Sequence, residues 1–358
     1  MKKILFIIIT IFLFPACTNN EKLIVDIFDV EYNIKGNAIN INKQNLFNPT
    51  SINVYDSLFL LIDYTEGNWL SLINKDNGVQ LRKAIEIGKG PNEITYLSNI
   101  CIDHKNDELI LLDIQQKQIK VANLDSLIIS DKDCFIKQIQ VKIDSGQIFN
   151  MAPINDSLFV GTGILLEGKY ALINQIGELI NVSYDYPFDE NHPNIDYDML
   201  GMAFQSIKTS NKDISRFVSG DLNCDLLTFF TYDSNGLIKL KEYNTYLPIY
   251  EEVRAGGGYG ARLSRDNKNG FVDLKSTSNY VYALYSGNSF NELNSDAFKA
   301  KNVLVFNWDG EPIVRFILDE FVISIDITED DNFIYAIVNN PYPEIHKYYI
   351  GKLLKSKL

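Results

Sequence analysis

Short runs of hydrophobic residues alternate with polar turns along nearly the whole chain. The stretch Ile100–Ser126 shows this clearly, because an apolar run at its start, a second at Glu108–Asp113 and a third at Gln118–Asn123 are separated by polar turns. Apolar runs bounded by Asn, Asp, Ser and Gly are typical of β-strands joined by hairpins. A further turn is predicted at Leu124–Ser126, and the spacing leaves no room for a helix. The pattern therefore predicts short antiparallel strands.

This unit is repeated about six times along the chain. Its clearest part is a turn of Asn, Asp or Ser followed by an aliphatic and aromatic run, which we interpret as the second strand of each copy. The equivalent positions in this strand are Leu58, Leu109, Leu158, Arg216, Val281 and Ile334. Their spacing of roughly 50 to 65 residues is that of propeller blades with loop insertions.

A second signal recurs at the same period, as turns rich in Asn, Asp and Gly between the predicted third and fourth strands. These turns are Asn74–Gly78, Asn123–Ser126, Asn174–Glu178, Asp233–Gly236 and Asn307–Glu311. Such residues tolerate the positive φ that tight hairpins require. A single four-stranded sheet cannot bury both of its faces, and radial stacking of sheets solves this problem. The sequence therefore predicts an all-β fold, a six-bladed β-propeller of four-stranded antiparallel blades over residues 45–354.

The last blade contains only three predicted strands of its own, at 322–328, 333–338 and 345–350. The segment near Ala38–Asn42 is predicted to supply the fourth strand and so to close the ring. Closure removes the sheet edges that would otherwise invite aggregation. Residues 18–44 are accordingly interpreted as a tether followed by a closing strand.

Residues 1–17 read as a secretory signal: Lys2 and Lys3 precede an apolar run that ends before Cys17. The run is shorter than the about 20 residues that a membrane-spanning helix needs. Leu13–Cys17 resembles a bacterial lipobox, so Cys17 is predicted to be lipidated; the alternative is ordinary cleavage that leaves a free thiol. The expected location is the cell envelope, as an outer-membrane-anchored lipoprotein, periplasmic or surface-exposed, with membrane contact through the lipid anchor only.

Three glycine-containing or irregular segments interrupt the repeat. The first, Ile87–Glu93, lacks the Lys-Ser/Thr ending and the following helix of a phosphate-binding loop, so we interpret it as a connection between blades that needs positive φ. The others are Tyr186–Asn194 and Glu251–Asn269, the latter either a mobile surface loop or a backbone shaped for a close contact. Insertions in a repeat usually lie on one functional face. The candidate binding residues in these loops are His192, Arg254, Tyr259 and Arg262.

The formal net charge of −13 argues against a nucleic-acid partner, because such partners are bound by basic stripes. Besides Cys17, the cysteines are Cys101, Cys134 and Cys224, which are far apart in sequence and lack the paired spacing of a metal site. Cys101 lies in a predicted strand and is expected to be a small buried residue. A disulfide between two of the three stays open.

No catalytic residue is predicted. The histidines, His104, His192 and His346, have no His or Cys partner at ligand spacing, and no G-x-S-x-G motif is present. The predicted innermost strands carry polar residues, which a wet channel would favour in any case. They are Asn53, Asn99, Asp103, Asn150, Gln205, Lys208, Asp273, Lys275 and Asp326. An oxygen-rich ring of this kind could hold calcium, which takes six to eight oxygen ligands.

Three stretches resemble a known family. Ile87–Glu93 looks like a G-x-G-P-x-E connection, Met202–Gln205 followed by Lys208-Thr209 looks like the start of a fourth blade, and Val281–Gly287 looks like part of a fifth. Together they resemble the TolB-like six-bladed propeller lipoproteins of Bacteroides-type bacteria, over roughly residues 45–354. The resemblance implies the fold but no settled activity, and it carries over no catalytic residue.

The favoured hypothesis is a cell-envelope lipoprotein whose propeller is a non-catalytic binding or scaffold module for a protein, peptide or glycan partner. It rests on the missing catalytic constellation and on aromatic side chains in the insertions, which suit recognition. The alternative is a metal-assisted, calcium-type hydrolase or lyase that acts at the mouth of the central channel.

Overall fold

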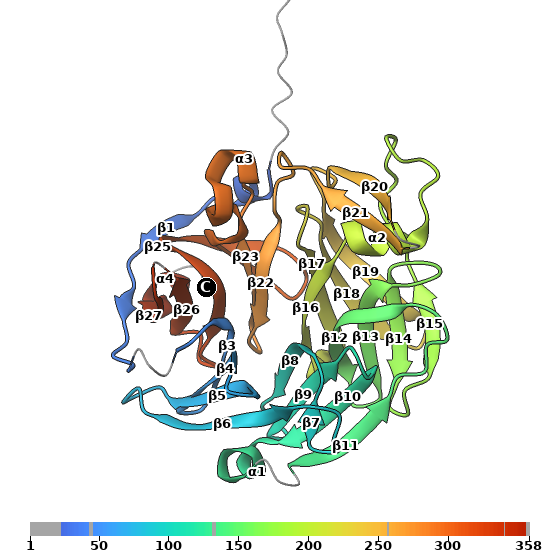
Figure 1. Cartoon of the computed structure of the whole chain (residues 1–358). Helices are drawn as coiled ribbons and strands as arrows, with labels where there is room; N and C mark the ends of the chain where they lie inside the picture. Colours follow the sequence, from blue (N-terminus) through green and yellow to red (C-terminus); the bar gives the residue numbers. More distant parts are fainter. Residues whose placement is uncertain (1–22, 43–45, 131–133, 256–257, 340, 356–358) are drawn as a thin grey trace, which may run out of the picture.

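The computed structural model describes residues 23–42, 46–130, 134–255, 258–339 and 341–355. These residues form a ring of β-sheets around a central channel, with α-helices confined to short connections (Figure 1). The prediction of an all-β, six-bladed propeller is confirmed. The equivalent positions of the sequence repeat all lie at the first or second residue of the second strand of a blade.

Each blade is built from four main strands, numbered outward from the channel. Blade 1 consists of β3 (Pro49–Tyr55), β4 (Leu58–Thr65), β5 (Asn68–Asn74) and β6 (Gln80–Ile87), with the short β7 (Glu93–Ile94) beside β6. Blade 2 consists of β8 (Leu97–Asp103), β9 (Glu108–Asp113), β10 (Gln118–Asn123) and β11 (Phe135–Gln140). Blade 3 consists of β12 (Gln147–Asn155), β13 (Leu158–Ile164), β14 (Tyr170–Asn174) and β15 (Leu179–Ser183). Blade 4 consists of β16 (Ser206–Asn211), β17 (Arg216–Asp221), β18 (Leu227–Asp233) and β19 (Gly236–Tyr243).

Blades 5 and 6 share one strand. Blade 5 consists of β22 (Phe271–Ser276), β23 (Tyr280–Tyr285), β24 (Ala300–Asn307) and the first half of β25 (Pro312–Ile327). The second half of β25 pairs instead with β26 (Phe333–Asn339) and becomes the innermost strand of blade 6, which continues with β27 (Pro343–Tyr349). The last two blades are therefore one continuous sheet.

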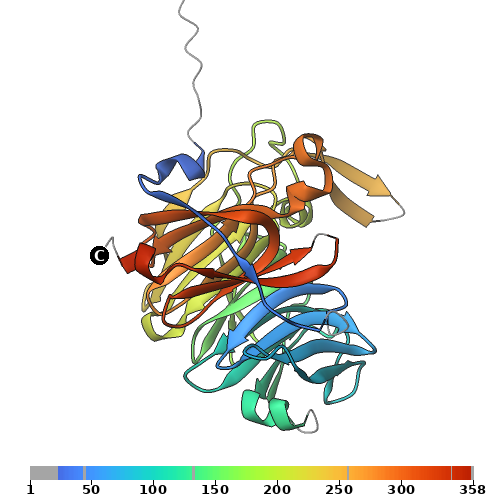
Figure 2. The same cartoon turned by 90° about the vertical axis from the view of Figure 1, so that its left-hand side faces the viewer.

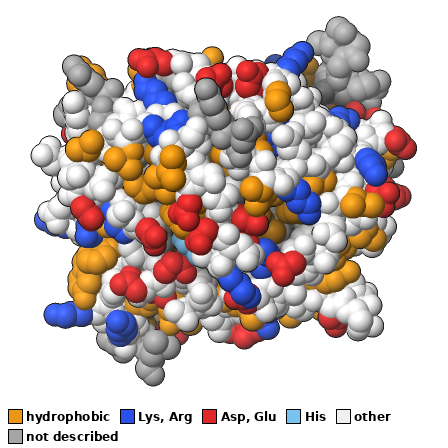
Figure 3. Space-filling view, turned by 90° about the horizontal axis from the view of Figure 1, so that it is seen from below, with side chains coloured by type: hydrophobic (Ala, Val, Ile, Leu, Met, Phe, Trp, Pro, Cys, Tyr) orange, Lys and Arg blue, Asp and Glu red, His pale blue; other side chains and the backbone are white. Residues whose placement is uncertain are grey.

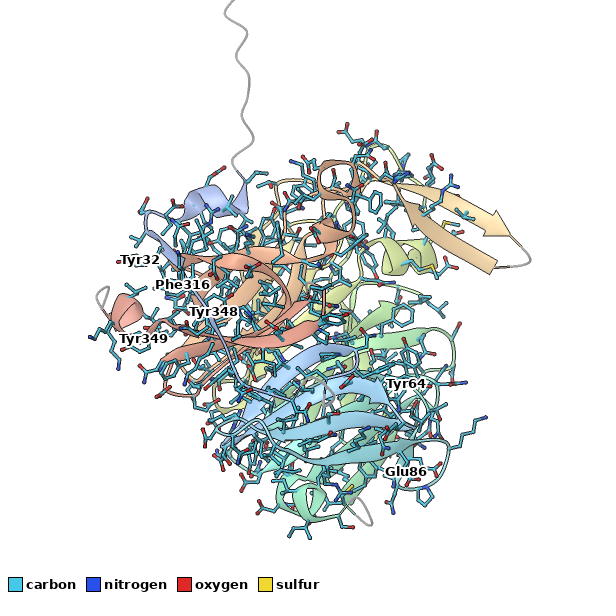
Figure 4. The ribbon with its side chains drawn as sticks, turned by 60° about the vertical axis from the view of Figure 1, so that its left-hand side comes forward. Tyr32, Tyr64, Glu86, Phe316, Tyr348 and Tyr349 are labelled. Carbon is cyan, nitrogen blue, oxygen red and sulfur yellow. The ribbon has the colours of Figure 1, made fainter. Side chains whose placement is uncertain are left out.

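The N-terminal segment adds outer strands to both of these blades. β1 (Glu31–Ile34) runs parallel to β25, and β2 (Asn37–Ala38) pairs antiparallel with β27 as the fourth strand of blade 6. Figure 2 shows this segment crossing the outside of the two blades, and Figure 4 shows Tyr32 of β1 near Phe316. Between β1 and β2, Gly36 lies so close to the Tyr348 ring that a Cβ there would be 2.5 Å from it. The predicted ring closure is confirmed, with pairing centred slightly before the predicted Ala38–Asn42.

The hydrophobic core consists of apolar layers between neighbouring blades. Phe59 of blade 1 meets Tyr335 of blade 6 with ring centroids 5.0 Å apart, and Tyr170 of blade 3 meets Phe230 of blade 4 at 4.9 Å. Each blade thus buries its two faces against two neighbours, which is why the ring is more stable than any isolated sheet.

Three local predictions were wrong, and the first concerns the connection after β10. The chain there forms the helix α1 (Leu124–Ile129) and not a simple turn. The Asn123 side chain accepts a hydrogen bond from the Ser126 amide and caps the helix, while Leu124 and Leu127, three residues apart, are buried.

The second wrong prediction concerns the glycines between blades 1 and 2. Neither Gly88 nor Gly90 has positive φ. Both instead lie against the Glu93 carboxyl group, which accepts a hydrogen bond from the Gly90 amide at 2.7 Å; a Cβ at Gly88 would be 1.9 Å from a Glu93 oxygen. A side chain at either position would therefore displace the Glu93 carboxyl group.

The third concerns the segment that was read as a loop after blade 4. It forms a two-stranded hairpin, β20 (Tyr250–Ala255) and β21 (Gly258–Leu263), with regular antiparallel pairing. The other insertion, Tyr186–Asn194, is followed by the helix α2 (Tyr197–Ala203), so blade 4 begins at Ser206 and not near Ala203.

The two faces of the ring differ in their connections (Figure 1). One face, which we call the insertion face, bears α2, the β20–β21 hairpin, α3 (Phe290–Leu293) and the adjoining η4 (Asn294–Phe298). The opposite face, which we call the hairpin face, bears α1 and the turns between the first and second strands.

Candidate functional site

The central cavity has a volume of about 920 Å³ and is lined by the innermost strands of all six blades. The structure places eight of the nine predicted channel residues in its lining: Asn53, Asn99, Asp103, Asn150, Lys208, Asp273, Lys275 and Asp326. The ninth, Gln205, precedes β16 and is exposed outside the lining, because blade 4 begins one residue after it. A binding role for these residues stays a prediction.

Several channel side chains link one blade to the next. Between blades 6 and 1, the Asp326 carboxylate accepts a hydrogen bond from the Val54 amide at 2.6 Å. Between blades 5 and 6, the Asp273 carboxylate accepts one from the Ile325 amide at 3.1 Å. Between blades 2 and 3, the Asn99 side-chain amide donates to the Met151 carbonyl at 2.8 Å.

Hydroxyl groups make the remaining links. Tyr55 donates to Asp107 between blades 1 and 2 at 2.7 Å, and Thr209 meets Ser276 between blades 4 and 5 at 2.6 Å. Between blades 3 and 4, the Thr162 hydroxyl lies 2.9 Å from that of Ser206. Every pair of neighbouring blades therefore has a polar link of this kind. Four of the six links involve cavity-lining residues, so the polar ring helps to hold the blades together.

Two lysines of the innermost strands also line the cavity. The Lys275 ammonium donates to the Asn53 amide oxygen at 2.6 Å, reaching from blade 5 past blade 6 to blade 1. Lys208 hydrogen-bonds Thr162, and burial, with the nearby positive charge of Lys169, holds its pKa well below the ordinary value. Burial also raises the pKa of Cys101 to about 11, so this thiol stays protonated.

Charged side chains gather where the cavity reaches the hairpin face, and Figure 3 shows acidic and basic groups interspersed around its centre. Lys212 of blade 4 forms ion pairs with Asp103 of blade 2 and, at 2.9 Å, with Asp156 of blade 3. His104 of blade 2 lies 3.2 Å from Glu329 of blade 6. The Lys212–Asp103 and His104–Glu329 contacts tie together loops that are not neighbours in the ring.

The charges at this end affect one another. Burial alone would raise the pKa of Asp103, but hydrogen bonds from Lys212 and Asn106 outweigh it and hold the pKa below the usual range. Burial raises the pKa of Glu329, against the opposing effect of His104. The sequence predicted no partner for His104. Its contacts with Glu329 and with the Tyr55 ring join residues that are far apart in the sequence, so they could not be predicted locally.

On the insertion face, His192 is held in place. Its Nδ1 lies 2.8 Å from an Asp189 carboxylate oxygen, and its ring stacks on Tyr250 of β20 with centroids 4.3 Å apart. Arg262 pairs with Glu251 across the hairpin. Arg254 and Tyr259 lie in the hairpin strands, and their side chains are outside the described part of the structure. The structure thus brings the predicted loop residues His192 and Arg262 to one face.

A buried ion pair anchors the α2 insertion and was missed from the sequence. The Lys169 ammonium lies 2.7 Å from both Asp221 carboxylate oxygens, and the two side chains are 2% and 0% exposed. The ammonium also lies over the rings of Tyr186 and Phe204, which pack under α2. Burial alone would lower the pKa of Lys169, but the Asp221 carboxylate raises it above the ordinary value.

None of the three cysteines that the structure describes, Cys101, Cys134 and Cys224, forms a disulfide. Among the residues that the structure describes, no group of three or more His, Cys, Asp or Glu side chains is arranged to hold a metal ion. Within the same ranges, no helix has the length and apolar character that crossing a membrane requires. Cys17, the predicted lipidation site, lies outside the described residues.

The ring of four-stranded blades around a polar cavity defines a six-bladed β-propeller. Residues 22–330 match the family model described as TolB-like 6-blade propeller-like, so the chain belongs to this family. A search of curated proteins finds no match to the chain.

Solved structures with the same fold include two from Bacteroides. A member of the DUF4221 family from Bacteroides vulgatus ATCC 8482 is 14% identical, with a TM-score of 0.59 over 88% of this chain and 97% of that one. A Bacteroides fragilis NCTC 9343 protein that is described as exported is 10% identical, with a TM-score of 0.54 over 89% of this chain and 98% of that one.

Proposed function

We propose that this protein is an exported propeller, anchored to the cell envelope through a lipid on Cys17, and that its insertion face is a non-catalytic binding surface for a protein, peptide or glycan. The observation that carries the proposal is the placement of α2, the β20–β21 hairpin and α3 together on one face. Insertions in a repeat protein commonly build its binding face.

Contacts between the insertions support this proposal. His192 stacks on Tyr250 of the hairpin, the Arg265 guanidinium lies 4.4 Å from the centre of the Phe290 ring in α3, and Asn291 donates to Asp266 at 2.6 Å. The insertions therefore brace one another, and a preorganised surface loses less entropy when it binds a partner.

The cavity wall also favours binding over catalysis. Its carboxylates Asp273 and Asp326 accept hydrogen bonds from the backbone of neighbouring blades, and Asp103 is paired with Lys212. A general base needs a lone pair directed at its substrate. These carboxylates instead face backbone amides and the Lys212 ammonium of the protein itself.

The binding face is tested by shortening the hairpin. Residues 252–261 are removed and Glu251 is joined to Arg262, its cross-strand neighbour, through an Asn-Gly turn. We expect envelope components that the intact protein captures to be lost, while cooperative unfolding by circular dichroism is retained. Ile176→Asp, in an exposed turn of the opposite face, is the matched control. Components captured equally by both variants would argue against this face.

The anchor is tested separately. Radiolabelled palmitate supplied to the expressing bacterium is expected to label the protein, and Cys17→Ser is expected to abolish the label and release the protein from the membrane fraction. An unlabelled wild-type protein would contradict the anchor but not the binding face.

A further inference from the structure

The cavity is chemically divided along its length. Lys212, Asp103 and Glu329 lie at the hairpin-face end. On blades 1 and 2, the described lining residues at the insertion-face end carry no formal charge; they are Asn48, Thr50, Tyr64, Trp69, Tyr96, Leu97 and Ser98. This end offers only aromatic rings, aliphatic groups, hydroxyls and amides to a ligand.

Three of these residues form a rim that we call the aromatic rim: Tyr64, Trp69 and Tyr96. The Tyr64 and Tyr96 rings meet Trp69 edge-to-face, with centroids 5.5 and 5.7 Å away. Trp69 is only 8% exposed and is fixed by a hydrogen bond from its Nε1 to the Ile94 carbonyl at 2.8 Å. Tyr64 and Tyr96 are 58% and 52% exposed. The rim therefore presents two open rings on a rigid base.

We propose that the aromatic rim binds a neutral sugar unit of a glycan. A sugar ring has an apolar face of C–H groups that packs on an aromatic ring, and hydroxyls around its edge that suit amide and hydroxyl partners. A charged ligand would gain no ion pair at this end. The inference rests on the proposed binding function and names its ligand class.

The fluorescence of Trp69 can report ligand binding at the aromatic rim. The chain has two tryptophans, and Trp308→Phe leaves Trp69 as the sole emitter. Into this variant we would titrate neutral cello-, xylo-, manno-, malto- and chitohexaose, together with a hyaluronan hexasaccharide as the charged counterpart and a proline-rich decapeptide, which also suits aromatic grooves. At least one neutral hexasaccharide is expected to change Trp69 emission saturably.

The decisive variant is Tyr64→Ala with Tyr96→Ala. Both side chains are half-exposed, so the fold should tolerate their loss, and the affinity for the sugar is expected to fall at least about tenfold. Tyr349→Ala is the matched control: Tyr349 is 48% exposed and lies on blade 6, far from Tyr64 in Figure 4. Its affinity should be unchanged.

Three outcomes would overturn the inference: no neutral hexasaccharide binds, the charged sugar or the peptide binds more tightly, or binding survives loss of both tyrosines. In each case the hairpin deletion still reports independently on the insertion face. If partner capture depends on the hairpin but no sugar binds, the proposed function stands and only the assignment of a glycan ligand is wrong.

Discussion

The insertion face and the hairpin face differ in how their connections are held. On the hairpin face, Lys212 and His104 reach partners on other blades, and these contacts tie short turns across the channel. On the insertion face, long segments brace one another through ring contacts and stand on the buried Lys169–Asp221 pair. The same repeat thus has one face whose turns are linked across the channel and one face whose connections are lengthened by inserted elements.

The largest loss of unfolding free energy is expected when the buried Lys169–Asp221 pair beneath the insertion face is broken. Lys169→Met would leave the Asp221 carboxylate buried without its partner, and loss of one member of a buried ion pair costs about 3–5 kcal/mol. Urea denaturation should therefore show a much lower free energy of unfolding.

The matched control is Lys241→Met, which removes an exposed pair with Glu311. Exposed pairs contribute about 0–1 kcal/mol, so this variant should unfold close to wild type. Equal costs for the two lysines would mean that the buried pair does not support the insertions in the way described.

A smaller loss is expected on the hairpin face. Lys212→Ala removes the hydrogen bond to Asp103 and leaves that buried carboxylate with its neutral partner Asn106, a loss of about 1.5–3 kcal/mol for a bond to a charged group. Lys105→Ala, which removes an exposed pair with Asp213, is the control and should cost much less.

The pH dependence separates a lost ion pair from lost packing. The pKa of Asp103 is lower in the folded protein than the usual value of about 4. Its contribution is therefore present above about pH 4 and is lost as the pH falls through the folded pKa. Wild type should lose more unfolding free energy than Lys212→Ala between about pH 6 and about pH 3. A constant difference between the two would contradict the electrostatic role.

Much of the fold could be predicted because its signals are local. The turn-plus-strand unit locates second strands such as β4 and β9, and the Asn, Asp and Gly turns mark hairpins such as Asn74–Gly78. The error at Leu124–Ile129 arose because a capped single helical turn has nearly the same composition as a polar hairpin followed by an apolar strand.

The site was less predictable because its contacts span large sequence distances. The repeat predicted that Asn99 and Asp103 lie on an innermost strand, but nothing local pairs Asp103 with Lys212, 109 residues away. Likewise Tyr64 and Tyr96 meet Trp69 only once β4, β5 and the connection to blade 2 come together. Aromatic residues near the insertion-face ends of these strands are the sequence signal that could have identified the aromatic rim.

The start of the described chain has a consequence for where captured molecules go. η1 (Ile24–Ile27) lies on the side of the ring that bears α3 in Figures 1 and 2, and Ile24 is buried in the same apolar cluster as Phe271 and Phe306. Only six residue steps separate Cys17 from Leu23, so their Cα atoms can be at most about 20 Å apart. A lipid on Cys17 would therefore keep this side of the ring close to the bilayer, so that whatever docks there is concentrated in the thin layer next to the lipid headgroups.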